Sequence, residues 1–277
     1  MAINSINTND GSFVALQNLA ATNASLNATQ DRISTGKKIA NSKDNGAIWA
    51  IAQNLRAASQ SINAVKQSLD RAQSTADVAI TAGTNVSDLL VQMKEKALAA
   101  ADRGLDTQSR LALNDQFKVL RDTIKKTVDN ADFNGSNMLK TVGTDMRALA
   151  NIAGTNVITI KAQSMALGSA NLTGLSATSS FNTASQASTF LASVNTAIER
   201  VNRALATMGA QYKAVELHNT FMAKLQDNLD AGVGNLVDAD LGRESARLQS
   251  LQSRQQLGVQ AASIANQSTS ALLGLFR

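Results

Sequence analysis

The chain contains neither cysteine nor proline among its 277 residues. Without cysteine it can form no disulfide and no thiolate metal site, which suits a chain that must travel unfolded without becoming cross-linked. Without proline, no position carries an obligatory helix break. One histidine, one tyrosine and one tryptophan leave little of the usual catalytic inventory. We therefore expect a protein that is not an enzyme and has no catalytic residues, cofactor or metal.

Charge and long apolar runs are also sparse. The net charge of +5 is spread along the chain and aromatic residues make up only 3% of it, so there is neither a phosphate-binding stripe nor a base-stacking platform. No run of about 18 apolar residues occurs, so we expect no membrane insertion. The opening MAINSINTNDG lacks the basic and apolar regions of a cleavable signal peptide. We expect no nucleic-acid partner and an export route other than that signal.

Both ends of the chain are amphipathic and poor in charge. They run from about Asn9 to Ser34 and from Asp240 to Arg277. A soluble monomer normally covers the outer face of a helix with Lys and Glu, so these helices are expected to pack against other helices. A membrane surface is the weaker alternative, because their polar faces lack the Lys/Arg excess of interfacial helices. The apolar positions proposed for subunit packing are Phe13, Leu16, Leu19, Leu26, Ile33, Leu241, Leu248, Leu251, Leu257, Ile264, Leu272 and Leu275.

Two long heptad patterns predict coiled-coil helices between these ends. The first predicts a helix over about 60–101, and the second covers 191–229 and opens with a capping box of Thr183 and Gln186. Its polar members, Asn219 and Gln226, are expected to set the register. The first frame reads Ile62, Val65, Leu69, Ala72, Ala76, Ala79, Gly83, Val86, Leu90, Met93 and Ala97.

The middle of the chain changes character. A third helix is expected over about 107–130, ending at the turn signal 132–135. The β-branched run 156–161, with 146–152 as its partner, predicts a small β-hairpin. The Gly/Ser/Thr-rich stretch from Ser164 to Thr183 is expected to form an outer loop or short strands. The predicted fold is mainly α: a long antiparallel coiled-coil rod with paired terminal helices and a small β-hairpin region at about 140–182.

Three isolated features have a structural and a functional interpretation. Asp238, Asp240 and Glu244 suggest a hard-cation cluster, but capping of the last helix, with an ion pair from Glu244 to Arg247, is favoured. The lone His218 is interpreted as a solvated or interface residue because no catalytic constellation surrounds it. Trp49, expected in a short helix after Asn45, is interpreted as a core or interface anchor. Each feature therefore favours structure over catalysis.

The chain resembles bacterial flagellins over nearly its full length. The resemblance is carried by five short motifs in the family's order, and the short middle is similar to the compact flagellins of alphaproteobacteria. The motifs are Ile3–Asn9, Arg32–Ile39 (family R-L-S-S-G-x-R-I), Ser42–Ala47 (A-K-D-D-A-A), Phe133-Asn134-Gly135, and the tail with Gln256, Gly258, Ala265-Asn266-Gln267 and Leu272–Arg277.

The resemblance implies a structural subunit that polymerises into the extracellular flagellar filament used for swimming. Residues 1–42 and 235–277 would form the terminal coiled-coil domain D0, and 43–234 the rod domain D1. Its partners would be copies of itself, an export chaperone, the type III export apparatus, and hook-associated and cap proteins. It would be exported unfolded and added at the distal tip, with its ends ordering on assembly. The alternative is a hook–filament junction protein, which shares the terminal design but does not form long fibres alone.

The resemblance also implies two surface properties. Outward hydroxyls of flagellins can carry O-linked sugars. Animal Toll-like receptors recognise a rod segment written roughly Q-R-V-R-E-L-A-V-Q, which corresponds to Val91–Leu98 here. Glu95 is kept, but Gln92 replaces an arginine and Lys96 a leucine, so weak or no receptor activation is expected. The candidate glycosylation positions are Ser164, Ser169, Thr173, Ser176, Thr178, Ser179, Ser180 and Thr183.

Overall fold

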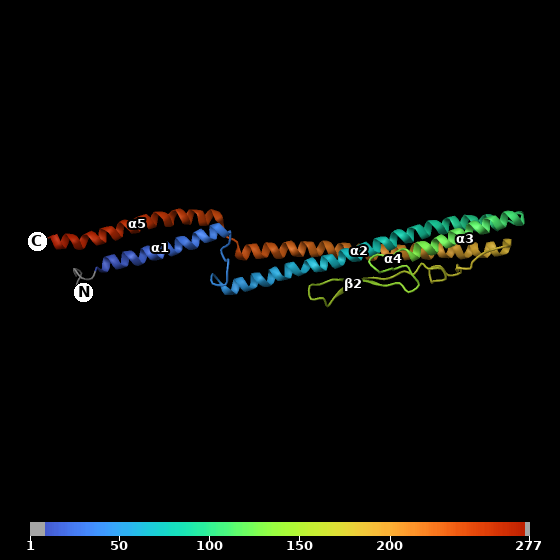
Figure 1. Ribbon diagram of the computed structural model, residues 1–277, viewed down its shortest axis with the longest axis horizontal. Helices are drawn as coiled ribbons and strands as arrows, with labels where there is room; N and C mark the ends of the chain where they lie inside the picture. Colours follow the sequence, from blue (N-terminus) through green and yellow to red (C-terminus); the bar gives the residue numbers. More distant parts are fainter. Residues whose placement is uncertain (1–8, 275–277) are drawn as a thin grey trace. The chain divides into compact units, whose positions relative to one another are not determined.

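The computed structural model describes residues 9–274, with side chains from residue 9 to residue 267. Within that part the chain forms five helices and one two-stranded antiparallel sheet, so the mainly α prediction is confirmed (Figure 1). The elements are α1 (Asp10–Thr35), α2 (Gly46–Ala100), α3 (Thr107–Asp129), β1 (Met146–Leu149), β2 (Val157–Ile160), α4 (Ala184–Val237) and α5 (Leu241–Gly274).

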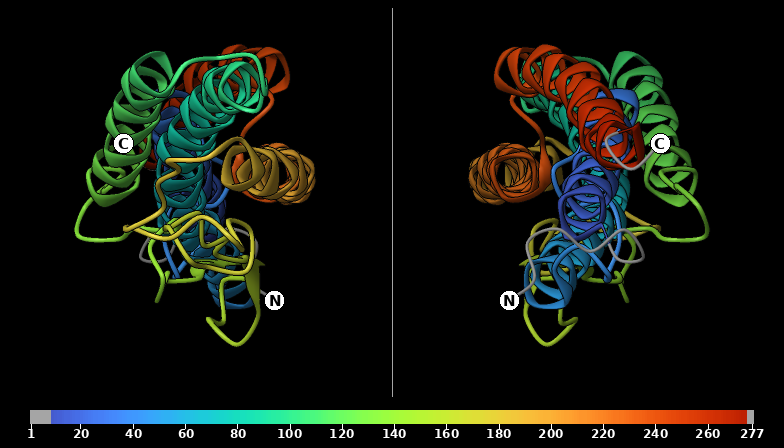
Figure 2. Two further views of the ribbon diagram at one scale, coloured as in Figure 1. Left: turned by 90° about the vertical axis from the view of Figure 1, so that its right-hand side faces the viewer. Right: turned by 90° about the vertical axis from the view of Figure 1, so that its left-hand side faces the viewer.

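The chain divides into two compact units. Residues 58–227 form one unit, and the segments on either side of it in the sequence, up to residue 57 and from residue 228, form the other. Viewed end on, the first unit has α2, α3 and α4 with the segment between α3 and α4 beside them (Figure 2). The two units are described in turn.

An antiparallel seam between α2 and α4 forms the core of unit 58–227. All eleven positions of the frame from Ile62 to Ala97 are buried, which confirms the heptad prediction for α2. The polar members of the α4 frame contact α2: Asn219 Nδ2 donates to Asp70 Oδ1 at 2.7 Å and Gln226 Nε2 to Asn63 Oδ1 at 3.1 Å. These paired polar groups can all be satisfied in one alignment only, so they fix the register of the two helices.

Glycine is required at one point of this seam. A Cβ built on Gly83 would lie 2.7 Å from Leu205 Cδ2 and 3.2 Å from the Met165 thioether sulfur. These distances are shorter than side-chain packing allows, so the absence of a side chain lets α4 and the loop that follows β2 approach α2 closely. Gly83, which interrupts the apolar frame, is therefore needed for close packing.

The turn between α2 and α3 depends on a buried arginine that the sequence interpretation missed. Arg110 donates from Nε to Ala100 O at 3.0 Å, and from Nη2 to Asp102 O at 2.9 Å and Leu105 O at 2.8 Å. Arg110 is only 8% exposed. Carbonyls at the end of a helix have no intrahelical partner, so this guanidinium satisfies the end of α2 and holds α3 against it.

The segment between α3 and α4 is more firmly packed than its composition suggests. The hairpin is confirmed, with Met146 opposite Ile160 and Leu149 opposite Val157. The stretch from Ser164 to Thr183, however, is not merely an outer loop and contains no strand. Four of its large apolar residues enter the core of the unit and are fully buried. They are Met165, Leu172, Leu175 and Phe181.

The second unit contains α1, the start of α2, the end of α4, and α5. The expectation that α2 begins near residue 60 was wrong: it begins at Gly46, capped by the Asn45 side chain, which accepts from Ile48 N at 3.1 Å. No proline or other breaker separates Gly46 from residue 60, so one helix continues through both stretches. Trp49 therefore lies in the first turn of α2, and it packs on a small core of Ile39, Ala52, Val233 and Val237.

The first prediction concerns Arg110. Replacing it with alanine removes three charge-assisted hydrogen bonds and should lower the free energy of unfolding of the monomer by about 2 kcal/mol or more. Arg110→Lys should recover only part of this, because an ammonium cannot reproduce the forked geometry. Urea denaturation followed by circular dichroism measures both changes. Arg103→Ala, at an exposed position in the same turn, is the matched control; equal stability of the Arg110 and Arg103 variants would contradict the assignment.

Candidate assembly site on the terminal helices

Local capping fixes where the two terminal helices begin. The Asn9 side chain accepts from Ser12 N at 3.0 Å at the start of α1, and Gly36, with φ of 67°, ends that helix. At the start of α5, Asp240 Oδ1 accepts from Arg243 N at 3.1 Å, so the capping role predicted for Asp240 is confirmed.

Glu244 does not pair with Arg247, so that part of the prediction was wrong. Its Oε1 lies 3.3 Å from Nη1 of Arg32, across the gap between α5 and α1. Lys37 and Asp238 meet in a β-bridge close by, and Ala239 N donates to Gly36 O at 2.9 Å. The three acidic residues thus have different partners, and nowhere in the described residues do three metal-ligating side chains of His, Cys, Asp or Glu converge.

α1 and α5 lie side by side and bury a heptad seam between them (Figure 1). The residues of this seam are buried or half-buried, while most of those between them are exposed, and they follow alternating steps of three and four. Most are small or polar. They are Ser12, Ala15, Leu19, Thr22, Leu26, Thr29 and Ile33 on α1, and Glu244, Leu248, Leu251, Gln255, Gly258, Ala262 and Ala265 on α5.

Small residues and polar cross-links set the geometry of this seam. A Cβ on Gly258 would lie 3.3 Å from Leu19 Cδ1, so the helices are in close contact there. Gln255 Nε2 donates to Asn23 Oδ1 at 2.7 Å, and Asn9 Nδ2 to Ala265 O at 2.8 Å. Together with the pair of Arg32 and Glu244, these contacts tie α1 to α5 at several levels. Their spacing fixes the register in a seam that has few large apolar residues.

The predicted packing residues divide between two faces. Leu19, Leu26, Ile33, Leu248 and Leu251 lie in the seam between α1 and α5. The side chain of Leu272 and the whole of Leu275 lie outside the described residues. The other five remain largely uncovered by this pairing: Phe13 (62% exposed), Leu16 (52%), Leu241 (50%), Leu257 (63%) and Ile264 (68%).

We call these five residues the outward stripe. Burying each large apolar side chain is worth about 1.5–3 kcal/mol, so covering these residues would stabilise an assembly. No helix in the described part of the chain is long and apolar enough to cross a membrane. The charge-poor faces around the outward stripe suit it for contact with further protein surface.

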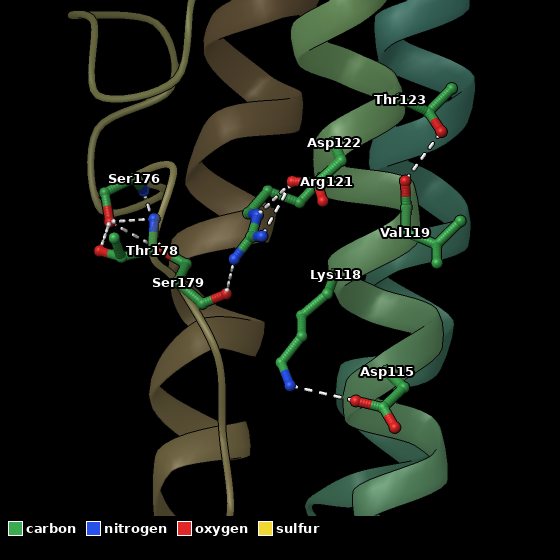
Figure 3. Close-up of polar contacts among 9 residues, drawn as sticks. All are labelled: Asp115, Lys118, Val119, Arg121, Asp122, Thr123, Ser176, Thr178 and Ser179. Carbon is green, nitrogen blue, oxygen red and sulfur yellow. Dashed lines mark hydrogen bonds and ion pairs between the residues drawn. The ribbon is translucent and has the colours of Figure 1, made fainter.

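Most of the candidate glycosylation positions are buried or occupied by structural hydrogen bonds. The Ser164 Oγ is buried, Ser169 Oγ donates to Ser164 O, Thr173 accepts from Arg200, and Thr183 caps α4 as predicted. Ser179 is buried and accepts from Ser176 N at 2.8 Å. Arg121 of α3 donates from Nη1 to Ser179 O at 2.7 Å, so α3 anchors this turn (Figure 3).

Two hydroxyls of this set remain well presented. Thr178 is exposed and its Oγ1 lies 3.1 Å from Ser176 Oγ at the turn drawn in Figure 3. Ser180 is exposed directly after the residue whose carbonyl Arg121 holds. Sequence composition alone could not separate these two exposed residues from the buried members of the set.

His218 has a structural partner. Its Nε2 lies 2.8 Å from Ala150 O, and its ring centroid lies 5.9 Å from that of Phe221. The histidine therefore links α4 to the end of β1. The ring is half-buried and has a partner within the chain, so the expectation of a solvated or interface position is replaced by a packing role.

Comparisons with known proteins agree with this architecture. The chain matches the model of the bacterial flagellin N-terminal helical region over residues 6–144 and that of the C-terminal helical region over residues 191–276. It is 55% identical to flagellin FljM of Caulobacter vibrioides, with all of both chains covered. It is 36% identical to a flagellin of Brucella melitensis, with 99% of both chains covered.

Solved structures show the same fold at lower identity. A putative flagellar hook-associated protein from Vibrio parahaemolyticus matches 70% of this chain and all of its own, with a TM-score of 0.58 at 15% identity. Bacillus cereus flagellin matches 56% of this chain and 88% of its own, with a TM-score of 0.50 at 23% identity. The chain belongs to the bacterial flagellin family and is a structural subunit of the flagellar filament.

Proposed function

We propose that the outward stripe is the surface through which the terminal helices of neighbouring subunits pack in the filament. The observation that carries this proposal is the division of the predicted packing residues into a seam covered within the chain and five residues left exposed. In this scheme residues 1–42 and 235–277 form D0, and residues 43–234 form D1 with its hairpin region at about 140–182. The pairing of α1 with α5 supports the first assignment.

Assembly through the outward stripe also suggests when the terminal helices fold. A seam of mostly small and polar residues offsets little of the conformational entropy lost by two long helices. The ends would then be disordered in the free subunit and become ordered when the outward stripe is buried. Such a subunit suits passage unfolded through the type III apparatus, with a chaperone covering the last helix, and addition at the distal tip outside the cell.

The junction-protein alternative shares the terminal helices and the contacts with hook-associated and cap proteins. The high identity to flagellins over the whole chain favours the main filament role. Self-polymerisation separates the two, because a filament subunit forms long fibres alone.

Among the candidate modification sites, Thr178 and Ser180 are the acceptors that the packing supports. Both residues are exposed, and Thr178 Oγ1 contacts only the exposed Ser176 Oγ, whereas Ser164 Oγ and Ser179 are buried. In the segment that corresponds to the receptor-binding motif, Gln92 and Glu95 are both exposed. Lys96 Nζ lies 3.1 Å from Glu95 Oε1. That ion pair competes for the one carboxylate that the family segment shares, which supports weak Toll-like receptor activation.

The second prediction tests the outward stripe. Leu257→Asp places a charge on a side chain that α1 does not cover, so the monomer should keep its unfolding free energy while filament formation is lost. Sedimentation and electron microscopy of the polymerising protein measure assembly, and urea denaturation measures stability. Gln260→Asp adds the same charge at an exposed polar position of α5 and should assemble. Filaments of normal length from Leu257→Asp would refute the role of the stripe.

The third prediction concerns glycosylation. Intact-mass measurement of filaments shed by the producing cells should show added sugar, and Thr178→Ala with Ser180→Ala should remove most of it. Ser164→Ala is the control and should leave the added mass unchanged, because the Ser164 hydroxyl is enclosed. Filament protein with the mass of the bare sequence would exclude modification.

The fourth prediction concerns receptor signalling. Purified monomer should activate Toll-like receptor reporter cells weakly. A Gln92→Arg, Lys96→Leu double variant should gain activity by about tenfold or more, since it restores an interface arginine and removes a charge from an apolar contact position. Asp88→Asn changes an exposed side chain of the same helix outside the segment and serves as the control. Strong signalling from the unmodified chain would overturn this prediction.

A further inference from the structure

A polar cavity beside α4 contains two arginines that no acidic side chain neutralises. The cavity has a volume of about 370 Å³. Arg200, Arg203 and Thr207 line it from α4, and Gln163 and Asn171 line it from the segment that follows β2. No Asp or Glu belongs to the lining. The volume lies in the range of small-ligand sites in proteins, about 300–1,000 Å³.

Arg200 is held in position by the loop that it faces. Its Nη1 donates to Ala170 O at 2.6 Å and to Thr173 Oγ1 at 2.9 Å. Both acceptors are neutral, so the positive charge remains uncompensated. Nε and Nη2 take part in neither contact. The geometry thus presents a guanidinium whose orientation is set and whose remaining donors are free for a ligand.

Arg203 follows one turn later on the same face of α4. Its side chain has no hydrogen bond or ion pair to any of the described residues. Like charges three residues apart on a helix repel weakly, and an anion between the two arginines would offset that repulsion. Asn171 is itself oriented by a hydrogen bond from Nδ2 to Ser164 O at 2.8 Å, which leaves the second hydrogen of that amide available.

We propose that this cavity binds a compact oxyanion, a carboxylate or a phosphate, between Arg200 and Arg203. Guanidinium groups match the geometry of both anions through paired N–H donors. The amide donors of Asn171 and Gln163 complete a lining that offers hydrogen-bond donors and no competing negative charge. In solution the ligand is a free oxyanion, and in a polymer an acidic side chain of a neighbouring copy supplies the same group.

Binding to the full-length monomer tests the site independently of assembly. Sodium phosphate is titrated while the side-chain amide signals of Asn171 and Gln163 are followed by NMR, with sodium chloride at the same ionic strength as the reference. Wild type should show saturable shifts with phosphate. Arg203→Gln should weaken binding by about tenfold or more, since a charge-assisted hydrogen bond contributes at least that much. Arg203 is chosen because Arg200 also anchors the loop.

Arg103→Gln is the matched control: it removes one exposed positive charge outside the cavity and should bind phosphate as wild type does. Equal responses to phosphate and chloride, or unchanged binding by Arg203→Gln, would overturn the proposal. Equilibrium dialysis of phosphate against assembled filaments then identifies the source. Uptake retained on filaments assigns the site to a free oxyanion, whereas uptake lost on assembly assigns it to a carboxylate of a neighbouring copy.

Discussion

The buried seam between α2 and α4 is the interaction on which unit 58–227 depends. Its alanines and Gly83 bring the helices close, and Asn219 and Gln226 hold them in one register. The hairpin takes its place from both helices, because Leu149 N donates to Ser68 Oγ of α2 and Lys161 N to Gln211 Oε1 of α4. A shift of the seam would separate these anchors. One packing interaction therefore positions the helices, the hairpin and the loops around them.

The terminal pair applies the same heptad geometry to different residues. Where the α2 seam is almost wholly apolar, the seam of α1 and α5 contains Thr29, Gln255, Gly258 and a partly buried ion pair. Polar contacts of this kind specify alignment more than they add stability. Glu244 illustrates the cost, since its Oε2 is buried without a partner among the described residues. The register of α1 against α5 is thus well specified, while the burial of apolar surface contributes little to their association.

The sequence predicted those parts of the fold whose periodicity is carried by apolar residues. The α2 seam, the helix over Thr107–Asp129, the hairpin and the Thr183 capping box could all be read from spacing and propensity. Arg110 could not, because its role depends on carbonyls that only the folded turn brings together. The start of α2 was missed because its first turns lie before the apolar frame begins.

The assembly site shows the same division. The large apolar residues of the terminal segments could be identified from the sequence. Which of them face the partner helix could not, because Ser12, Thr29 and Gly258 occupy seam positions without being apolar. Leu16 and Leu19 look equivalent by residue type, yet only Leu19 falls on the heptad that faces the other helix. Position within the heptad separates Leu19 from Leu16, whereas Leu241 is exposed at the first residue of α5 although it continues the spacing of the seam.

The balance between the two faces has a physical consequence for a polymer. If α1 and α5 buried all of their large apolar residues against each other, the chain would be complete as a monomer and would have little drive to assemble. If they buried none, the two helices would have no defined register against each other when they order. A small, polar, well-registered inner seam combined with the outward stripe avoids both outcomes. Alignment is set within the chain, and in the proposed assembly the exposed apolar residues are buried by contacts between subunits.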